Sequence, residues 1–182
     1  MHSGITYSLI YMMIDYVNQI IADQFDASLC TLNQCVSICP TEHWTGLIGK
    51  YEFWHVAYHT LHYVDLYLSP DEKSFEPPPF HRPNTAFFGK LPWPPHEEVS
   101  TAEPYEKSVI IDYVAICRRK ASHTIASETQ DSLKKPSGFP WYSMSRGEHH
   151  LCSIRHVQHH AGQMCAYLRK HTDLEFDWIG KA

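Results

Sequence analysis

The sequence has no excess of positive charge and no long apolar run. Lys and Arg total 15 against 20 for Asp and Glu, a net charge of −5, so a broad basic surface for a nucleic-acid backbone is not expected. Polar residues interrupt each apolar stretch before it reaches the roughly 20 residues that cross a membrane. The N-terminus lacks the basic start and apolar block of a secretory signal. These absences predict a cytoplasmic protein with no nucleic-acid or membrane partner.

Cysteine pairs with the spacing of zinc-ribbon or redox motifs are also missing. The six cysteines are Cys30, Cys35, Cys39, Cys117, Cys152 and Cys165. None of them forms a C-x-x-C pair, which excludes zinc-ribbon and thioredoxin-type motifs. Spacings of five and four in the first three fit small apolar residues on a helix. We therefore expect buried, reduced thiols, as in a reducing compartment.

The alternation of polar and apolar residues typical of strands is absent, whereas helical periodicity is strong. Apolar residues recur every three to four positions over 6–38, 46–68, 101–130 and 145–171. This pattern predicts four helices, and the spacing of Ser145 and Glu148 predicts a capping box at the start of the last one. A chain of 182 residues with 43% apolar residues can bury one core, so we expect a single all-α domain over 1–182. An up-down four-helix bundle is the architecture that this pattern favours.

A long irregular segment, 69–100, separates the second and third predicted helices. Nine of the twelve prolines lie between Pro70 and Pro104, which is incompatible with a regular helix. A loop of this length is uncommon in a compact domain unless it is a lid, a binding loop or disordered. Its aromatic residues argue against disorder. Two alternatives remain at this point: the loop packs on the helices, or it also shapes a pocket.

Histidine is unusually frequent, with 14 residues, and two groups of histidines have helical spacing. His55, His59 and His62 lie within about 60° of one another on one helix face. His156 and His160 are one turn apart on another helix. Apolar residues continue the first stripe, so it points inward. Burying imidazoles costs free energy unless each finds a partner, and one divalent cation is a partner for several of them.

The H-x-x-x-H pair of His156 and His160 presents two nitrogens to a single ion, as in helical zinc sites. His55 on a facing helix is the best candidate for the third ligand, which leaves one coordination position for water or substrate. His59 lies one turn further on, with three alternative roles: it replaces His55, it is a fourth ligand, or it is the catalytic base. Gln163 is expected to orient a ligand by hydrogen bonding.

A carboxylate-bridged di-metal centre is disfavoured by the sequence. Such bundles use two Glu-x-x-His motifs, and here the motif occurs only once, at Glu52 and His55. Metalloprotease H-E-x-x-H, G-x-S-x-G and phosphate-binding G-x-x-x-x-G-K-[ST] motifs are absent as well. The remaining metal chemistry is a mononuclear histidine site.

Three short motifs resemble those of the DinB-like proteins, a family that includes thiol-dependent S-transferases and related metal-dependent hydrolases. They are EFWHVAYH over 52–59, HxxHHAGQ over 156–163 and WIG over 178–180. The resemblance implies an up-down four-helix bundle with a divalent metal, zinc or nickel, held by three histidines. Carried over by position, the ligands are His55, His156 and His160. The segment 69–100 is longer and richer in proline than the connection usual in that family.

Two functional hypotheses follow. In the first, the chain is an enzyme whose metal activates water or a thiol, and the resemblance implies hydrolysis or transfer of a low-molecular-weight thiol to an electrophile. Its partner is then a small-molecule substrate, and His59 is the candidate proton acceptor. In the second, the chain is a non-catalytic metal-binding bundle or an interaction module. Broad helix faces make a homodimer plausible in either case.

Overall fold

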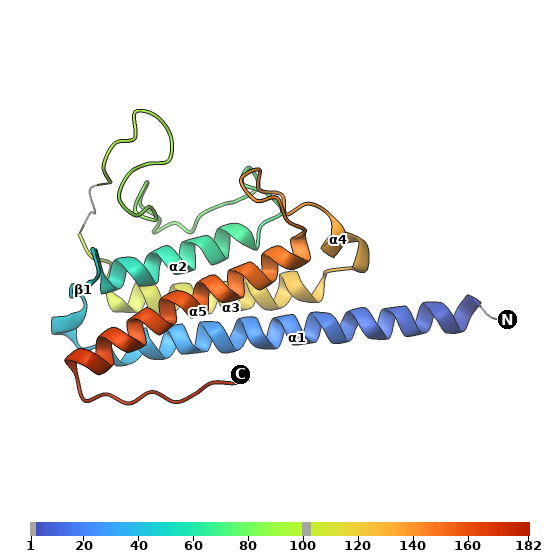
Figure 1. Cartoon of the computed structure of the whole chain (residues 1–182), viewed down its shortest axis with the longest axis horizontal. Coiled ribbons are helices and arrows are strands. Elements are labelled where there is room, and N and C mark those ends of the chain that lie inside the picture. The colour runs from blue at the N-terminus through green and yellow to red at the C-terminus, as the bar shows by residue number, and fades with distance from the viewer. Residues whose placement is uncertain (1–2, 100–102) are drawn as a thin grey trace.

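The computed structural model describes residues 3–99 and 103–182, with side chains described from Met12 onward within the first helix. The chain is mostly helical, with one small two-stranded sheet (Figure 1). The elements are α1 (Ser3–Ile38), the 3-10 turn η1 (Thr41–His43), β1 (Leu47–Ile48), β2 (Tyr51–Glu52), α2 (Phe53–Tyr67), α3 (Lys107–Ala126), α4 (Gln130–Lys134) and α5 (Arg146–His171). No helix in these ranges is long and apolar enough to cross a membrane.

The four longest helices lie side by side, with α1 and α2 each packed against both α3 and α5. The chain direction does not alternate through all four, because α2 and α3 run the same way (Figure 1). Trp54 lies against Tyr105 near the start of α3, and Asp65 pairs with Lys120 further along both helices. The strict up-down order expected from the sequence therefore fails between α2 and α3. The long 69–106 segment permits this arrangement by returning the chain to the end where α2 began.

The second helix begins later than the sequence predicted. Residues 46–52 form an antiparallel hairpin in place of the first helical turns, with Ile48 paired to Tyr51. Gly49 lies in the turn with φ +65°, a left-handed conformation that glycine adopts without the steric cost of a side chain. The hairpin moves the start of α2 to Phe53. As a result, His55 lies in the first turn of α2, near the long segment.

The last helix begins as the sequence predicted. The Ser145 side chain accepts a hydrogen bond from the Glu148 backbone N–H, and the Glu148 carboxylate accepts one from the Ser145 backbone N–H, which completes the capping box. The third helix is shorter than expected, from Lys107 to Ala126, and α4 follows it as a separate turn. The residue at which the sequence predicted the third helix to start, 101, lies outside the described residues.

The core fills the space between the four long helices. Phe25, Leu29, Leu61, Ile110 and Met164 are fully buried there, and each buried side chain of this size stabilises the fold by about 1.5–3 kcal/mol. All six cysteines are free, as expected; three are buried and three half-buried.

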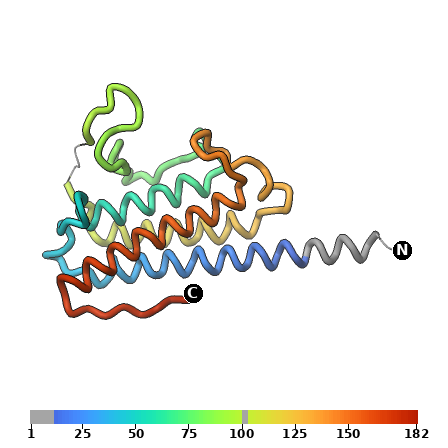
Figure 2. Tube along the Cα trace, in the orientation of Figure 1, coloured from blue at the N-terminus to red at the C-terminus, as the bar shows by residue number. Residues whose placement is uncertain are grey.

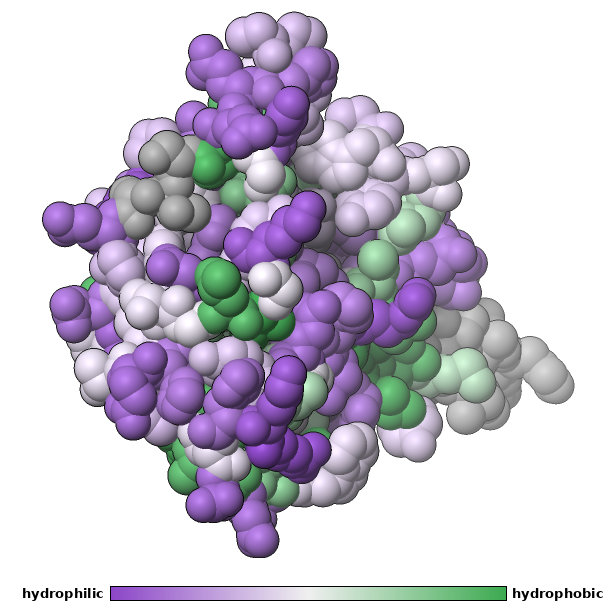
Figure 3. All heavy atoms as spheres, turned by 60° about the vertical axis from the view of Figure 1, so that its left-hand side comes forward, coloured by the Kyte–Doolittle hydropathy of each residue, from purple (hydrophilic) through white to green (hydrophobic). Residues whose placement is uncertain are grey.

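Two features lie outside this packing. α1 is the longest helix, and Met13 and Tyr16 on it are largely exposed. The chain after α5 runs back beside α1 (Figure 2), where Lys181 pairs with Asp23. The end of the molecule where α2 begins and α5 ends is mostly hydrophilic on the face seen in Figure 3. Apolar side chains appear on that face only in small, separate patches.

Candidate metal centre

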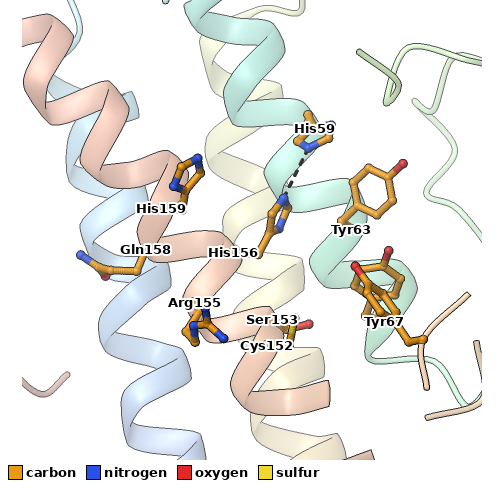
Figure 4. A pocket seen from close by; sticks show the side chains of 10 residues that line it. His59, Tyr63, Tyr67, Cys152, Ser153, Arg155, His156, Gln158 and His159 are labelled. Atoms are coloured by element: carbon orange, nitrogen blue, oxygen red, sulfur yellow. Dashed lines mark hydrogen bonds between the residues drawn. The ribbon is translucent and has the colours of Figure 1, made fainter. Parts of the chain in front are cut away.

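Three histidines converge between α2 and α5. One ring nitrogen from each of His59, His156 and His160 lies within 4.8 Å of the other two. The ring centroids are 4.7 Å apart for His156 and His160, 5.1 Å for His59 and His160, and 5.3 Å for His59 and His156. Figure 4 shows His59 on α2 pointing across to His156 on α5. The three rings form a triangle of the size that surrounds one ion.

The helix periodicity of α5 explains why its two histidines meet α2. Val157 and Ala161 are fully buried, so they fix the core-facing side of α5. His156 and His160 precede these two residues by one position each, which turns both rings to the edge of the core where α2 passes. Because α2 and α5 run in opposite directions (Figure 1), His59 arrives opposite the pair.

Hydrogen bonds fix the tautomers of two of the rings. Nδ1 of His59 lies 2.7 Å from the carbonyl oxygen of Ala86, which can only accept, so Nδ1 carries the proton. Nδ1 of His160 lies 2.9 Å from the side-chain oxygen of Gln163 and donates to it in the same way. In both rings the lone pair is therefore on Nε2. Metal-binding histidines are oriented in this manner by partners at their second nitrogen.

The separation between nitrogens also fits a cation. Nε2 of His59 and Nε2 of His156 are 3.3 Å apart. Two ligand nitrogens of a tetrahedral zinc, each about 2.05 Å from the ion, are about 3.4 Å apart. The existing spacing thus matches the edge of a metal tetrahedron, and the donor set of three imidazoles suits zinc or nickel.

Burial keeps these imidazoles neutral at physiological pH. Loss of hydration lowers the pKa of His59 to about 2 and that of His156 to about 4, since the charged form is the one that loses most when water is removed. Burial also lowers the pKa of His160. The rings additionally disfavour protonation of one another by charge repulsion. A neutral imidazole is the form that binds a metal.

The irregular segment covers one side of the centre. The Phe88 ring stacks on His59, with centroids 3.8 Å apart and planes 13° apart, and lies edge-on 6.0 Å from His160. Together with the Ala86 carbonyl, this contact shows that the segment both packs on α2 and shapes the site. Tyr63 closes the adjacent side, 4.8 Å from His59.

His55 does not join the triangle, in contrast to the ligand set predicted from the sequence. Its Nε2 lies 2.7 Å from the carbonyl oxygen of Thr85, so that nitrogen is a donor and has no lone pair to offer. The ring is buried beside Trp54 and Phe88. His59 takes the position assigned to His55, one turn further along α2. Of the residues on α2, His59 is thus the one that lies in the triangle with His156 and His160.

A pocket opens directly beside the triangle. It has a volume of about 810 Å³, enough for a small organic molecule. Its lining comprises His59, Tyr63, Tyr67, Tyr142, Cys152, Ser153, Arg155, His156, Gln158 and His159. Figure 4 shows Tyr63 and Tyr67 of α2 on one side of His156, and Arg155, Gln158 and His159 of α5 on its other side. The pocket combines aromatic surface with one positive charge, that of Arg155.

No family model, curated protein or solved structure matches the chain. The resemblance to the DinB-like proteins therefore stays a prediction.

The predicted set included two of the three histidines, and it also included Gln163, which makes the expected contact with His160. Phe88 and the Ala86 carbonyl were missed. Residues in an irregular segment have no periodic pattern that would identify them. The aromatic residues of 69–100 indicated only that this segment is ordered.

Proposed function

We propose that this chain is a metal-dependent enzyme in which His59, His156 and His160 hold one divalent cation, zinc or nickel. The observation that supports this is the convergence of three neutral imidazoles, of which His59 and His160 have their tautomers fixed with Nε2 unprotonated. The Nε2 atoms of His59 and His156 are 3.3 Å apart, the separation expected for two ligands of one cation. A shared cation accounts for all three.

A divalent cation bound by three protein ligands lowers the pKa of a coordinated water or thiol and supplies a nucleophile near neutral pH. The residues around it have separate tasks. Ala86 and Gln163 hold the Nδ1 protons of two ligands. Phe88 excludes water on the side of the irregular segment. The open side faces the pocket, which is the route for a substrate.

The pocket supports a small-molecule substrate with an apolar part and an anionic group. Tyr63, Tyr67 and Tyr142 offer aromatic surface, and Arg155 offers a guanidinium that pairs with a carboxylate or phosphate. We propose hydrolysis or transfer of a low-molecular-weight thiol as the reaction. We further propose that the four long helices form a bundle related to that of the DinB-like proteins, with α2 and α3 parallel instead of in strict up-down order. The protein is proposed to work in the cytoplasm with its thiols reduced.

Metal analysis of protein purified without a polyhistidine tag tests the centre. After removal of metal with a chelator and reloading with zinc or nickel, the wild type should hold about one ion per chain. His59→Ala, His156→Ala and His160→Ala should each lose stoichiometric binding. His159→Ala is the matched control, because this exposed histidine lines the same pocket but lies outside the triangle. It should bind like the wild type.

His55→Ala distinguishes the structural site from the one predicted by sequence. Retained metal in this variant supports the triangle. Lost metal in His55→Ala together with retained metal in His59→Ala would overturn it. Stoichiometric metal without activity in thiol-transfer and hydrolase screens would favour the alternative, a non-catalytic metal-binding bundle.

A further inference from the structure

Two cysteines face each other away from the metal centre, where α1 packs against α5. The Sγ atoms of Cys35 and Cys165 are 3.0 Å apart, although both thiols are free. The two residues are 130 positions apart in sequence, so the helix packing alone brings them together. The Cys35 thiol also lies 3.7 Å from the carbonyl oxygen of Ala161, one turn before Cys165.

This separation is short enough for a bond to form with little movement. An S–S bond is about 2.05 Å long, so the two sulfur atoms need to approach by only about 1 Å. The helices that carry them are already packed together. By contrast, Cys39 and Cys117 have their thiols on the carbonyl oxygens of Pro40 and Leu61.

The two thiols differ in the way that a peroxide-reactive pair requires. Cys35 is fully buried, whereas Cys165 is only half-buried. The contact with the Cys35 sulfur and the nearby charge of Arg169 lower the pKa of Cys165, against the opposing effect of its burial. Sharing a site with Cys165 raises the pKa of Cys35, as does its own burial. Cys165 is the more exposed of the two, so we expect it to react first, with Cys35 beside it as the second thiol.

We propose that Cys35 and Cys165 are an oxidative modification site, at which hydrogen peroxide joins α1 to α5 by a disulfide. The Cys165 thiolate attacks one peroxide oxygen, so that an S–O bond forms, the O–O bond breaks and the departing hydroxide takes a proton to become water. The Cys35 sulfur then attacks the sulfenic acid; the S–S bond forms, the S–O bond breaks, and the thiol proton leaves with the hydroxyl as a second water. Two thiols lose two electrons, and one peroxide is reduced to two waters.

The bond ties the helix that carries His156 and His160 to the longest helix of the molecule. The closed loop of 130 residues removes conformational freedom from the unfolded chain. The oxidised protein should therefore unfold at a temperature about 10 °C higher than the reduced protein. A reductant such as dithiothreitol should reverse this shift.

Peptide mapping of the full-length protein tests the proposal. The reduced chain is treated with hydrogen peroxide, alkylated and digested without reductant. The expected result is one linked peptide pair containing Cys35 and Cys165, with the other four thiols alkylated. Cys30→Ser is the matched control, since Cys30 is also half-buried on α1, and it should leave the linked pair unchanged. Six alkylated thiols, a different cysteine pair, or a sulfinic acid at Cys165 without the linked pair would each overturn the proposal.

A second variant tests the order of the two steps. In Cys35→Ala the partner thiol is absent, so Cys165 should accumulate as a sulfenic acid that dimedone traps and mass spectrometry detects. In Cys165→Ala, Cys35 should stay unmodified, because the buried thiol is not reached directly. Dimedone adduct at Cys35 in this second variant would contradict the assignment of Cys165 as the reacting thiol. The wild-type mapping decides the disulfide itself, even if either variant folds poorly.

Discussion

The histidine triangle and the cluster around Glu128 are both buried polar groups between helices, but they are satisfied in different ways. At the end of α3, Glu128 Oε1 lies 2.5 Å from Arg146 Nε and 3.0 Å from His150 Nε2, with Ser132 on its other oxygen. Its side chain is 5% exposed. Negative and positive groups therefore balance within the cluster. In the triangle the rings are neutral, and their partners are carbonyl oxygens and one another.

On the proposed function, this difference separates a structural site from a metal-binding site. The Glu128 cluster joins α3, α4 and the start of α5, and its carboxylate is already paired with the Arg146 guanidinium. In the triangle, His59 and His160 use Nδ1 to donate to oxygen atoms, which leaves a lone pair on Nε2 of each ring that can bind a cation. Removing a charged partner should thus damage the first site most, whereas the second should respond to added cation.

Loss of the negative charge at Glu128 should have the largest effect. In Glu128→Gln the Arg146 guanidinium stays buried without its carboxylate, which is expected to lower the free energy of unfolding by about 3 to 5 kcal/mol. Urea denaturation measures this directly. Asp131→Asn is the matched control, because Asp131 is exposed on α4, and its effect should be within about 0.5 kcal/mol. Metal stoichiometry should be unchanged in both variants.

Acid should reveal the same cluster in the wild type. Burial alone would raise the pKa of Glu128, but hydrogen bonds from His150, Ser132 and Arg146 outweigh it and lower the pKa to about 2, from 4.5. Between pH 4.5 and 2 the unfolded chain binds more protons at this residue than the folded chain, so stability falls as pH falls. The contribution is complete above pH 4.5 and amounts to about 3 kcal/mol.

The difference in stability between wild type and Glu128→Gln isolates that contribution. It should shrink steadily from pH 5 to pH 2 in urea titrations, since the protonated glutamate and the glutamine then carry the same charge. A constant difference over this range would contradict the assignment.

Added zinc should stabilise the wild type and leave a ligand variant unchanged. At free zinc of about 100 times the dissociation constant, binding to the folded state alone contributes about 2.7 kcal/mol. In His59→Ala this increment should disappear, whereas in His159→Ala it should persist. Thermal unfolding with and without zinc measures both. An equal zinc-induced shift in His59→Ala and wild type would remove the distinction between the two polar sites.

The smallest effect should come from a residue that only orients a ligand. Gln163→Ala removes the oxygen that holds the Nδ1 proton of His160, and metal affinity should fall by about tenfold. Competition with a metal chelator measures the change. Gln158→Ala is the matched control, as Gln158 is exposed on the same helix and lines the pocket without bonding to a ring. Its affinity should equal that of the wild type.

The sequence predicted the helical character, the start of α5 at its capping box and two of the three converging histidines. It assigned His55 instead of His59 because both lie on one stripe, only about 40° apart around the helix. Which of the two histidines contacts α5 depends on the residue at which α2 begins. The hairpin at 47–52 sets that start at Phe53. Each strand of the hairpin has only two residues, too few to show the alternation of polar and apolar residues from which a strand is predicted.

The Glu128 cluster was not foreseen for a related reason. Its residues come from the ends of three helices. Contacts between helix ends depend on how the helices are arranged in space, and the periodicity of the sequence does not predict that arrangement. The parallel course of α2 and α3 was missed as well. Short loops would have required antiparallel neighbours, but the proline-rich connection lifts that requirement.

That connection is much longer than bridging demands. α2 has 15 residues and so measures about 22 Å, a distance that about seven extended residues would span. The segment 68–106 is several times longer. Most of its length is thus available for other tasks, and its residues 85–88 supply the carbonyl oxygens on His55 and His59 and the ring stacked on His59. Insertions near exposed positions of this segment, such as Lys73, should be tolerated, whereas a deletion that shifts residues 85–88 would expose the imidazoles of His55 and His59 to solvent.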